Sequence, residues 1–260
     1  MTWSQRRQLF IAGIIFAVLL VIAFLIALPY LNKKPTCFDG RQNGTEIGKD
    51  CGGNCEMLCS SQVNNLTILW ARVFPVSNDL YNAMAYVENS NAKAGIKEIS
   101  YQFDVYDKDG IFLIRKTGST YIPPNGKFAI FEGAINVGNR EPKNIQFKFT
   151  STPVWYKTKI QPEKIPLFIK DKIISNADTT PKLAASISNE SLQNIPELDV
   201  VAILFDSNDN AVAIGKTYID NLLAGSSKQL FFTWPKPFSE SPVRIDIIPK
   251  INVFSADFGQ

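Results

Sequence analysis

An uncharged run of 20 residues near the N-terminus constrains this chain more than any other feature. It begins at Leu9, ends at Leu28 and contains no charged or strongly polar side chain. As an α-helix, 20 residues span about 30 Å, the thickness of the hydrocarbon core of a bilayer. A helix in a soluble core rarely stays apolar on every face over such a length. We therefore predict a transmembrane helix over residues 9–31 that contacts the lipid bilayer, after a cytoplasmic tail over residues 1–8.

A cleaved signal peptide is the alternative interpretation of this run. The apolar region of a signal peptide is usually about 7–15 residues long and ends in a small-x-small site. The run here is longer, and its best candidate site, Leu25-Ile26-Ala27, fits that pattern poorly. An uncleaved signal-anchor is therefore favoured. Two basic residues flank the run on each side, so charge alone does not decide its orientation.

The four cysteines indicate which side of the membrane holds the rest of the chain. They are Cys37, Cys51, Cys55 and Cys59, clustered among Gly, Asn and Asp. This pattern predicts a small knot with two disulfides over residues 35–60, and three pairings are possible. Because disulfides persist in oxidising compartments, we predict a cytoplasmic N-terminus and an extracytoplasmic body. A four-cysteine zinc site is the alternative, but zinc sites commonly bring their ligands in two close pairs such as C-x2-C, which the spacing x13, x3, x3 fits poorly.

The cysteine-rich segment also carries oxygen-bearing side chains separated by glycines. These are Asp39, Asn43, Glu46 and Asp50. Oxygen ligands at short intervals predict a possible calcium site, although the spacing is not that of an EF-hand and these residues are also ordinary turn formers. The pattern D-G-x-x-N-G-x-E-x-G-x-D-C-G-G-x-C resembles a short cysteine motif that recurs in bacterial cell-surface proteins. That resemblance implies a surface location and no particular activity.

Beyond Ser60 the sequence alternates between apolar and polar residues, as half-buried strands do. Turn clusters of Asn, Asp, Gly and Pro separate these segments. Landmarks then recur at offsets of 97 to 100 residues. The matches are 87–89 with 187–189, 96–99 with 195–198, 105–107 with 204–206, 120–122 with 217–219, and Gly126 with Gly225. We predict an all-β body of two tandem Ig-like β-sandwiches, over residues 64–160 and 167–258, joined by a proline-bearing linker.

The first copy resembles a known family at one run of residues. Phe103-Asp104-Val105-Tyr106-Asp107-x-x-Gly110 is similar to the signature of the FxLYD family, which comprises Ig-like sandwiches of bacterial and archaeal envelope proteins. The resemblance covers residues 83–149 and implies a fold and a location, without an enzymatic activity. The second copy departs from the pattern, with Ala202 for the first aromatic, Phe205 for the tyrosine and Asp209 for the glycine.

The shared landmarks are expected to determine the fold rather than the function. Asp107 and Asp206 end core strands, where an aspartate caps a hairpin turn through the backbone of that turn. Gly126 and Gly225 precede the next strand, where we expect a turn with positive φ.

Little in the sequence indicates catalysis. The chain contains no histidine, which excludes histidine-based triads, general bases and metal sites. It also lacks a nucleophile elbow and a phosphate-binding glycine loop, so we predict that it is not an enzyme. The predicted binding residues are the aromatics Trp155, Tyr156, Trp234 and Phe238, which can stack on a sugar ring or contact a partner. Their packing in the core or between the domains is the alternative.

These patterns together predict a single-pass, membrane-anchored binding or stalk protein of a prokaryotic cell envelope. Its partners would be the bilayer, through residues 9–31, and another envelope protein or a glycan. Nucleic acid is not expected, because residues 35–260 are nearly neutral. Two alternatives remain open: an accessory subunit of a membrane export or division complex, and an envelope enzyme, which the missing histidine disfavours.

Overall fold

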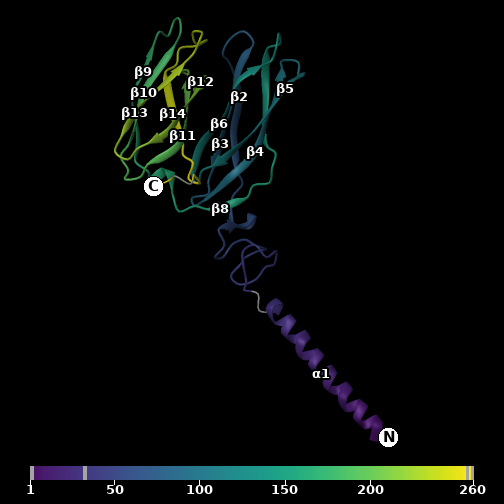
Figure 1. Cartoon of the computed structure of the whole chain (residues 1–260). Helices are drawn as coiled ribbons and strands as arrows, with labels where there is room; N and C mark the ends of the chain where they lie inside the picture. The colour runs from purple at the N-terminus through teal and green to yellow at the C-terminus, as the bar shows by residue number, and fades with distance from the viewer. Residues whose placement is uncertain (1–2, 32–33, 256–257, 259–260) are drawn as a thin grey trace. The chain divides into compact units, whose positions relative to one another are not determined.

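The computed structural model describes residues 3–31, 34–255 and 258 (Figure 1). Met1 and Thr2 of the predicted tail and the flanking Lys33 lie outside the described residues. The chain divides into two compact parts, residues 1–55 and residues 56–260, and each is described by itself.

The first part contains the helix α1, Trp3–Leu31, which is 29 residues long. Within Trp3–Leu28 no residue is buried, and by length and composition this segment is able to cross a membrane. The helix covers the predicted span and begins at Trp3, so residues 3–8 of the predicted tail are helical too. The cysteine-rich loop follows. Among its described residues up to Cys55, the only strand-like pairing is an isolated β-bridge between Gly48 and Cys51.

The second part is built from antiparallel strands, which confirms the predicted all-β body. Residues 56–157 form the first sandwich, with the strands β1 Met57–Leu58, β2 Thr67–Pro75, β3 Leu80–Asn89, β4 Ala94–Asp107, β5 Phe112–Ile122, β6 Gly126–Asn136, β7 Pro142–Phe149 and β8 Trp155–Lys157. One sheet has the order β2-β3-β6, and the other has the order β1-β8-β4-β5, with β7 also paired to β4. Phe103, Phe128 and Ile130 are among the side chains buried between them.

The second sandwich follows a linker that includes a short 3-10 helix, Pro162–Lys164. Its strands are β9 Leu167–Ser175, β10 Lys182–Asn189, β11 Ile195–Phe205, β12 Ala211–Leu222, β13 Ser227–Thr233 and β14 Arg244–Lys250. They form the sheets β13-β10-β9 and β12-β11-β14. Leu183, Val200 and Phe232 are buried between these two sheets.

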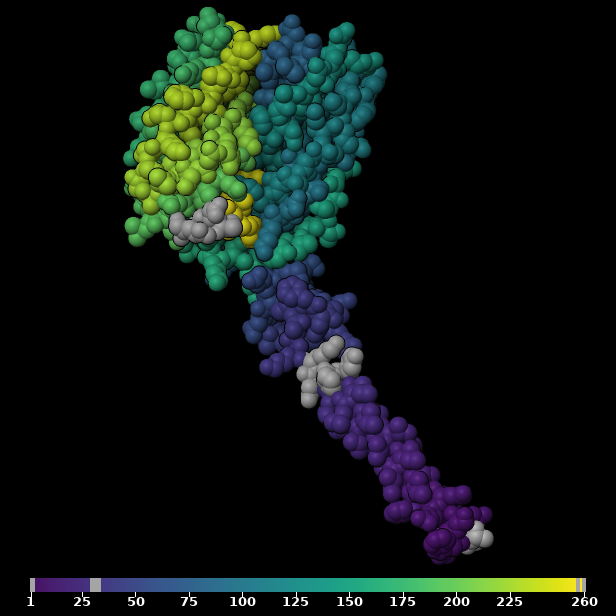
Figure 2. Space-filling view, in the orientation of Figure 1, coloured from purple at the N-terminus to yellow at the C-terminus, as the bar shows by residue number. Residues whose placement is uncertain are grey.

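The two sandwiches pack face to face, as the neighbouring teal and yellow-green bodies in Figures 1 and 2 show. We call this the docking contact. It joins the β2-β3-β6 sheet to the β12-β11-β14 sheet through an apolar cluster of its own. The buried members are Phe74, Met84, Ala129, Val201, Ile203, Phe205 and Ile214. The four sheets therefore lie in one stack, and the two sandwiches are not arranged end to end.

The docking contact joins unlike faces of the two sandwiches. In the strand registers, Met84 opposite Phe131 corresponds to Ala184 opposite Phe231, so β2-β3-β6 matches β9-β10-β13. The other sheets match as well, because Asp104 opposite Arg115 corresponds to Ile203 opposite Ile214. The sheet through which each sandwich docks therefore corresponds to the sheet that the other sandwich leaves undocked.

The free faces carry polar residues at several positions where their docked counterparts are apolar, although Ile173 and Phe231 are exposed on the free face of β9-β10-β13. Where the contact has Ile203 and Ile214, the free face has Asp104 and Arg115, with 2.5 Å between the carboxylate and Nε. Where the contact has Trp70 and Tyr86 as neighbours, the free face of β9-β10-β13 has Lys170 and Ser186. Polar residues on outer faces oppose further stacking of repeats.

Candidate site between the sandwiches

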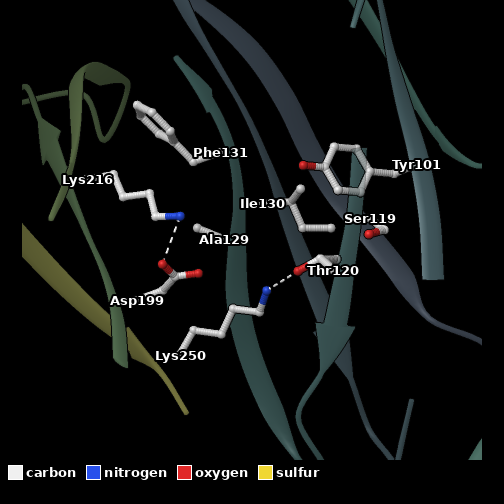
Figure 3. Close-up of a pocket in the computed structure, with 9 residues that line it drawn as sticks. All are labelled: Tyr101, Ser119, Thr120, Ala129, Ile130, Phe131, Asp199, Lys216 and Lys250. Atoms are coloured by element: carbon white, nitrogen blue, oxygen red, sulfur yellow. Dashed lines mark hydrogen bonds and ion pairs between the residues drawn. The ribbon is translucent and has the colours of Figure 1, made fainter. Parts of the chain in front are cut away.

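A small polar cavity lies in the docking contact, and strands from both sandwiches line it (Figure 3). Its volume is about 90 Å³, which is room for about three water molecules. The first sandwich contributes Tyr101, Ser119, Thr120, Ala129, Ile130 and Phe131, and the second contributes Asp199, Lys216 and Lys250. The cavity thus brings together residues more than 100 positions apart in the sequence.

Lys250 at the end of β14 is the most unusual of these residues, because only 4% of it is exposed. Its Nζ donates a hydrogen bond to Oγ1 of Thr120 in the other sandwich. The same Nζ lies 4.1 Å from the centre of the Tyr121 ring, and the Tyr121 hydroxyl donates to the Lys250 carbonyl at 2.7 Å. Burial lowers the pKa of Lys250 from 10.5 to about 7, since a charged amine loses its hydration there.

Two charged neighbours act on Lys250 in opposite directions. Asp199 is directly opposite Lys250 in the β11–β14 register, and its carboxylate raises the lysine pKa against the larger effect of burial. Asp199 Oδ1 lies 2.8 Å from Nζ of Lys216, which lowers the Lys250 pKa. The only described carboxylate lining the cavity is therefore engaged by a second ammonium group.

The tyrosines around the cavity stay protonated hydrogen-bond donors. The Tyr101 hydroxyl donates to Oε1 of Glu132 at 2.7 Å, and burial followed by this bond raises the pKa of Tyr101. Burial also raises the pKa of Tyr121. The arrangement buries Lys250 beside two neutral phenols and a carboxylate that Lys216 already engages, which suits proton uptake and release by Lys250 more than covalent catalysis.

The prediction that the aromatic residues offer exposed binding faces is wrong for both tryptophans. Trp155 is 5% exposed in the first core and Trp234 is 7% exposed in the second, where Nε1 donates to the Ile214 carbonyl at 2.9 Å. Apolar ring area and a satisfied indole N–H favour burial. Tyr156 is half-buried below Lys97, whose Nζ lies 4.2 Å from the ring centre. Phe238 is half-buried, with its ring centre 5.1 Å from that of Trp234.

The predicted disulfides are confirmed. Cys37 and Cys55 are bonded, with 5.6 Å between their Cα atoms, and Cys51 and Cys59 are disulfide-bonded as well. No described cysteine is free, so no thiolate is available for the alternative zinc site.

The four predicted calcium ligands lie within one loop, where several of their oxygens accept hydrogen bonds from the loop itself. Asp39 accepts from the backbone N–H of Arg41 at 3.0 Å and from the Asn43 amide at 2.8 Å, and the latter bond does most to lower the pKa of Asp39. Asp50 accepts from the Gly40 N–H at 3.0 Å, and Glu46 accepts from the Asn43 N–H at 3.1 Å. Calcium binding stays a prediction.

Sequence reasoning missed the cavity residues. A lysine in a strand usually lies at the surface, so Lys250 gave no signal by itself. A signal exists in the repeat, because the register positions of Asp199 and Lys216 are filled by Ser100 and Thr117 in the first sandwich. The second sandwich therefore carries charged residues at two positions where the first sandwich has uncharged ones.

Comparisons with known proteins name no relative. No family model matches the chain, and no curated protein matches it. Among solved structures, it is similar to a red sea bream transglutaminase at 10% identity and a TM-score of 0.22, over 72% of this chain and 29% of that one. It is also similar to a glycoside hydrolase family 2 beta-glucuronidase at 10% identity and a TM-score of 0.21, over 66% and 24% of the two chains. The chain spans less than a third of either protein, and these likenesses carry no argument about its function.

Proposed function

We propose that this chain is a single-pass, membrane-anchored protein whose double-sandwich head binds another component of a prokaryotic cell envelope, a protein or a glycan. The observation that carries the proposal is an apolar helix with no buried residue within Trp3–Leu28, followed closely by a disulfide-bonded loop. An apolar helix of this length suits a bilayer, and disulfides suit the oxidising side of it. The N-terminus is then cytoplasmic and residues 35–260 extracytoplasmic.

A binding head fits the body better than a stalk does. Sandwiches arranged end to end would extend farther from the membrane, whereas the docking contact places the two sandwiches face to face. The described residues offer no histidine and no buried acid–base pair at the cavity. We propose binding rather than catalysis for these reasons, and the resemblance to the FxLYD family supports an envelope location.

Topology is tested by labelling intact cells with a membrane-impermeant maleimide, with and without reduction. We expect the peptides bearing Cys37, Cys51, Cys55 and Cys59 to be labelled only after reduction. Two reporters serve as controls: Ser4→Cys should be labelled only after lysis, and Ser207→Cys on intact cells without reduction. Native thiols that react only after lysis would place the body in the cytoplasm and overturn the proposal. A mature chain that begins near Leu28 would identify a cleaved signal instead.

A further inference from the structure

The docking contact contains charges at positions where the matching free face has none. Asp199, Lys216 and Lys250 lie at the cavity, and the register positions of the first two are filled by Ser100 and Thr117 on the free face. Charged groups are normally more abundant on free surfaces, because burial removes their hydration. Asp199 and Lys216 depart from this rule, so these two charges are specific to the docking contact.

Among the described residues that line the cavity, no carboxylate is left to Lys250 alone, although the Tyr121 and Phe128 rings attract its ammonium form. From the first sandwich these are the Thr120 hydroxyl, the Tyr121 ring at 4.1 Å, the Phe128 ring at 5.8 Å, and Tyr101 with its partner Glu132 across the cavity. From the second sandwich they are Asp199 and Lys216, which pair with each other. A buried ammonium ion needs a carboxylate of its own to offset its lost hydration.

We propose that Lys250 makes the docking contact depend on pH: the two sandwiches close over the neutral amine and separate more readily when that amine takes up a proton. The linker after β8 keeps them tethered, so separation does not require either sandwich to unfold. This proposal does not depend on the membrane anchor.

The direction of the effect follows from linkage. The pKa of Lys250 is about 7 in the closed contact, against an ordinary value of 10.5 in water. Closure therefore releases a proton, and its equilibrium constant rises about tenfold per pH unit between pH 7.5 and 10 and is nearly flat below about pH 6. The raised pKa values of Tyr101 and Tyr121 keep these phenols neutral over this range.

The test measures closure directly on the full chain in detergent micelles. Spin labels on a ketone-bearing amino acid at Lys143 and Ser227, one in each sandwich, report the inter-sandwich distance without using cysteine. Distances are recorded from pH 5.5 to 9.5, at a fixed urea concentration below unfolding that brings wild-type opening into the measurable range. We expect the open fraction to rise on acidification.

Two variants at the same position make the test decisive. Lys250→Met removes the titrating group and should stay closed at every pH, whereas Lys250→Arg remains charged and should be open at every pH. Lys108→Met, at an exposed lysine away from the docking contact, is the matched control and should keep a pH-dependent contact. The proposal fails if Lys250→Met opens in acid as the wild type does, or if Lys250→Arg stays closed. It also fails if the lysine NMR signal that Lys250→Met removes titrates near 10.5.

Discussion

Two buried asparagines tie together segments at matching places in the two sandwiches. Asn89 and Asn189 are each 0% exposed. The Asn89 amide donates to the carbonyls of Ala94 and Pro123, both at 2.8 Å, and its oxygen accepts from the Asn91 N–H at 3.0 Å. Asn189 likewise donates to the carbonyls of Gln193 and Leu222. One short side chain thereby satisfies backbone groups of loops that regular pairing leaves unpaired.

Replacing Asn189 with alanine is expected to lower the free energy of unfolding by about 2–4 kcal/mol, because buried carbonyls lose their donor and no water replaces it. The exposed Asn208→Ala is the control and should change stability by less than about 0.5 kcal/mol. Urea unfolding of both variants gives the comparison. A loss for Asn189→Ala no larger than that of the control would contradict the structural role.

At the scale of single elements, the hairpin caps predicted from the sequence are confirmed. Asp107 is the last residue of β4, and its Oδ1 accepts from the N–H groups of Asp109 and Ile111 at 3.0 and 2.8 Å. Asp206 does the same after β11, accepting from Asn208 and Asn210 at 2.8 Å each. Gly110 has φ +77° in the first hairpin, and Asp209 adopts φ +60° at the matching turn. Aspartate tolerates this left-handed conformation, so the loss of glycine does not break the motif.

The β11–β12 hairpin should be acid-sensitive. The N–H of Asn210 holds the pKa of Asp206 below its ordinary 3.8. Stability from this carboxylate is therefore present above pH 4 and is lost as pH falls through the lower folded value. Asp206→Asn should make the urea midpoint fall less steeply between pH 4 and 2 than in the wild type. The exposed Asp178→Asn should leave the slope unchanged, and equal slopes for Asp206→Asn and wild type would contradict the prediction.

Alternation predicted strands well but did not predict which faces dock. A strand such as β4 shows a period of two because its faces differ, and this pattern is visible in one sequence. In β11, residues 200–205 are all buried because one side packs in the core and the other in the docking contact. Such a continuous apolar run signals burial on both faces but names no partner. The burial of Trp234 and Lys250 was not predictable from the sequence for the same reason, since distant strands determine their surroundings.

At the scale of the whole molecule, the face-to-face stack has two ends that differ from each other. Its contact is heterologous, and heterologous contacts between repeats extend indefinitely unless the outer faces prevent it. The Asp104–Arg115 pair ends one side, and Lys170 and Ser186 lie on the other. These polar residues oppose further stacking, although Ile173 and Phe231 leave apolar area exposed on the β9-β10-β13 face.

Placing the residues of the docking contact at the matching positions of the free faces should allow two chains to stack. Chains carrying Asp104→Ile with Arg115→Ile should form a one-to-one complex with chains carrying Lys170→Trp, Ala184→Met and Ser186→Tyr. Each variant alone should remain largely monomeric in sedimentation experiments, because its new face has no matching one. Lys108→Ile with Lys143→Ile is the control for added apolar surface and should not pair with the second variant. Equal association of every combination would show nonspecific adhesion instead.

The order of strands along the chain gives the docking contact a role in biosynthesis. The first sandwich is complete once Lys157 has emerged, but the face that covers Phe74 and Met84 requires β14, which ends at Lys250. At about 5–20 residues per second, synthesis leaves this apolar face uncovered for roughly 5–20 s. Nascent chains in that interval are the ones most exposed to mispairing with each other, and a chaperone that recognises the β2-β3-β6 face would have its substrate only until β14 arrives.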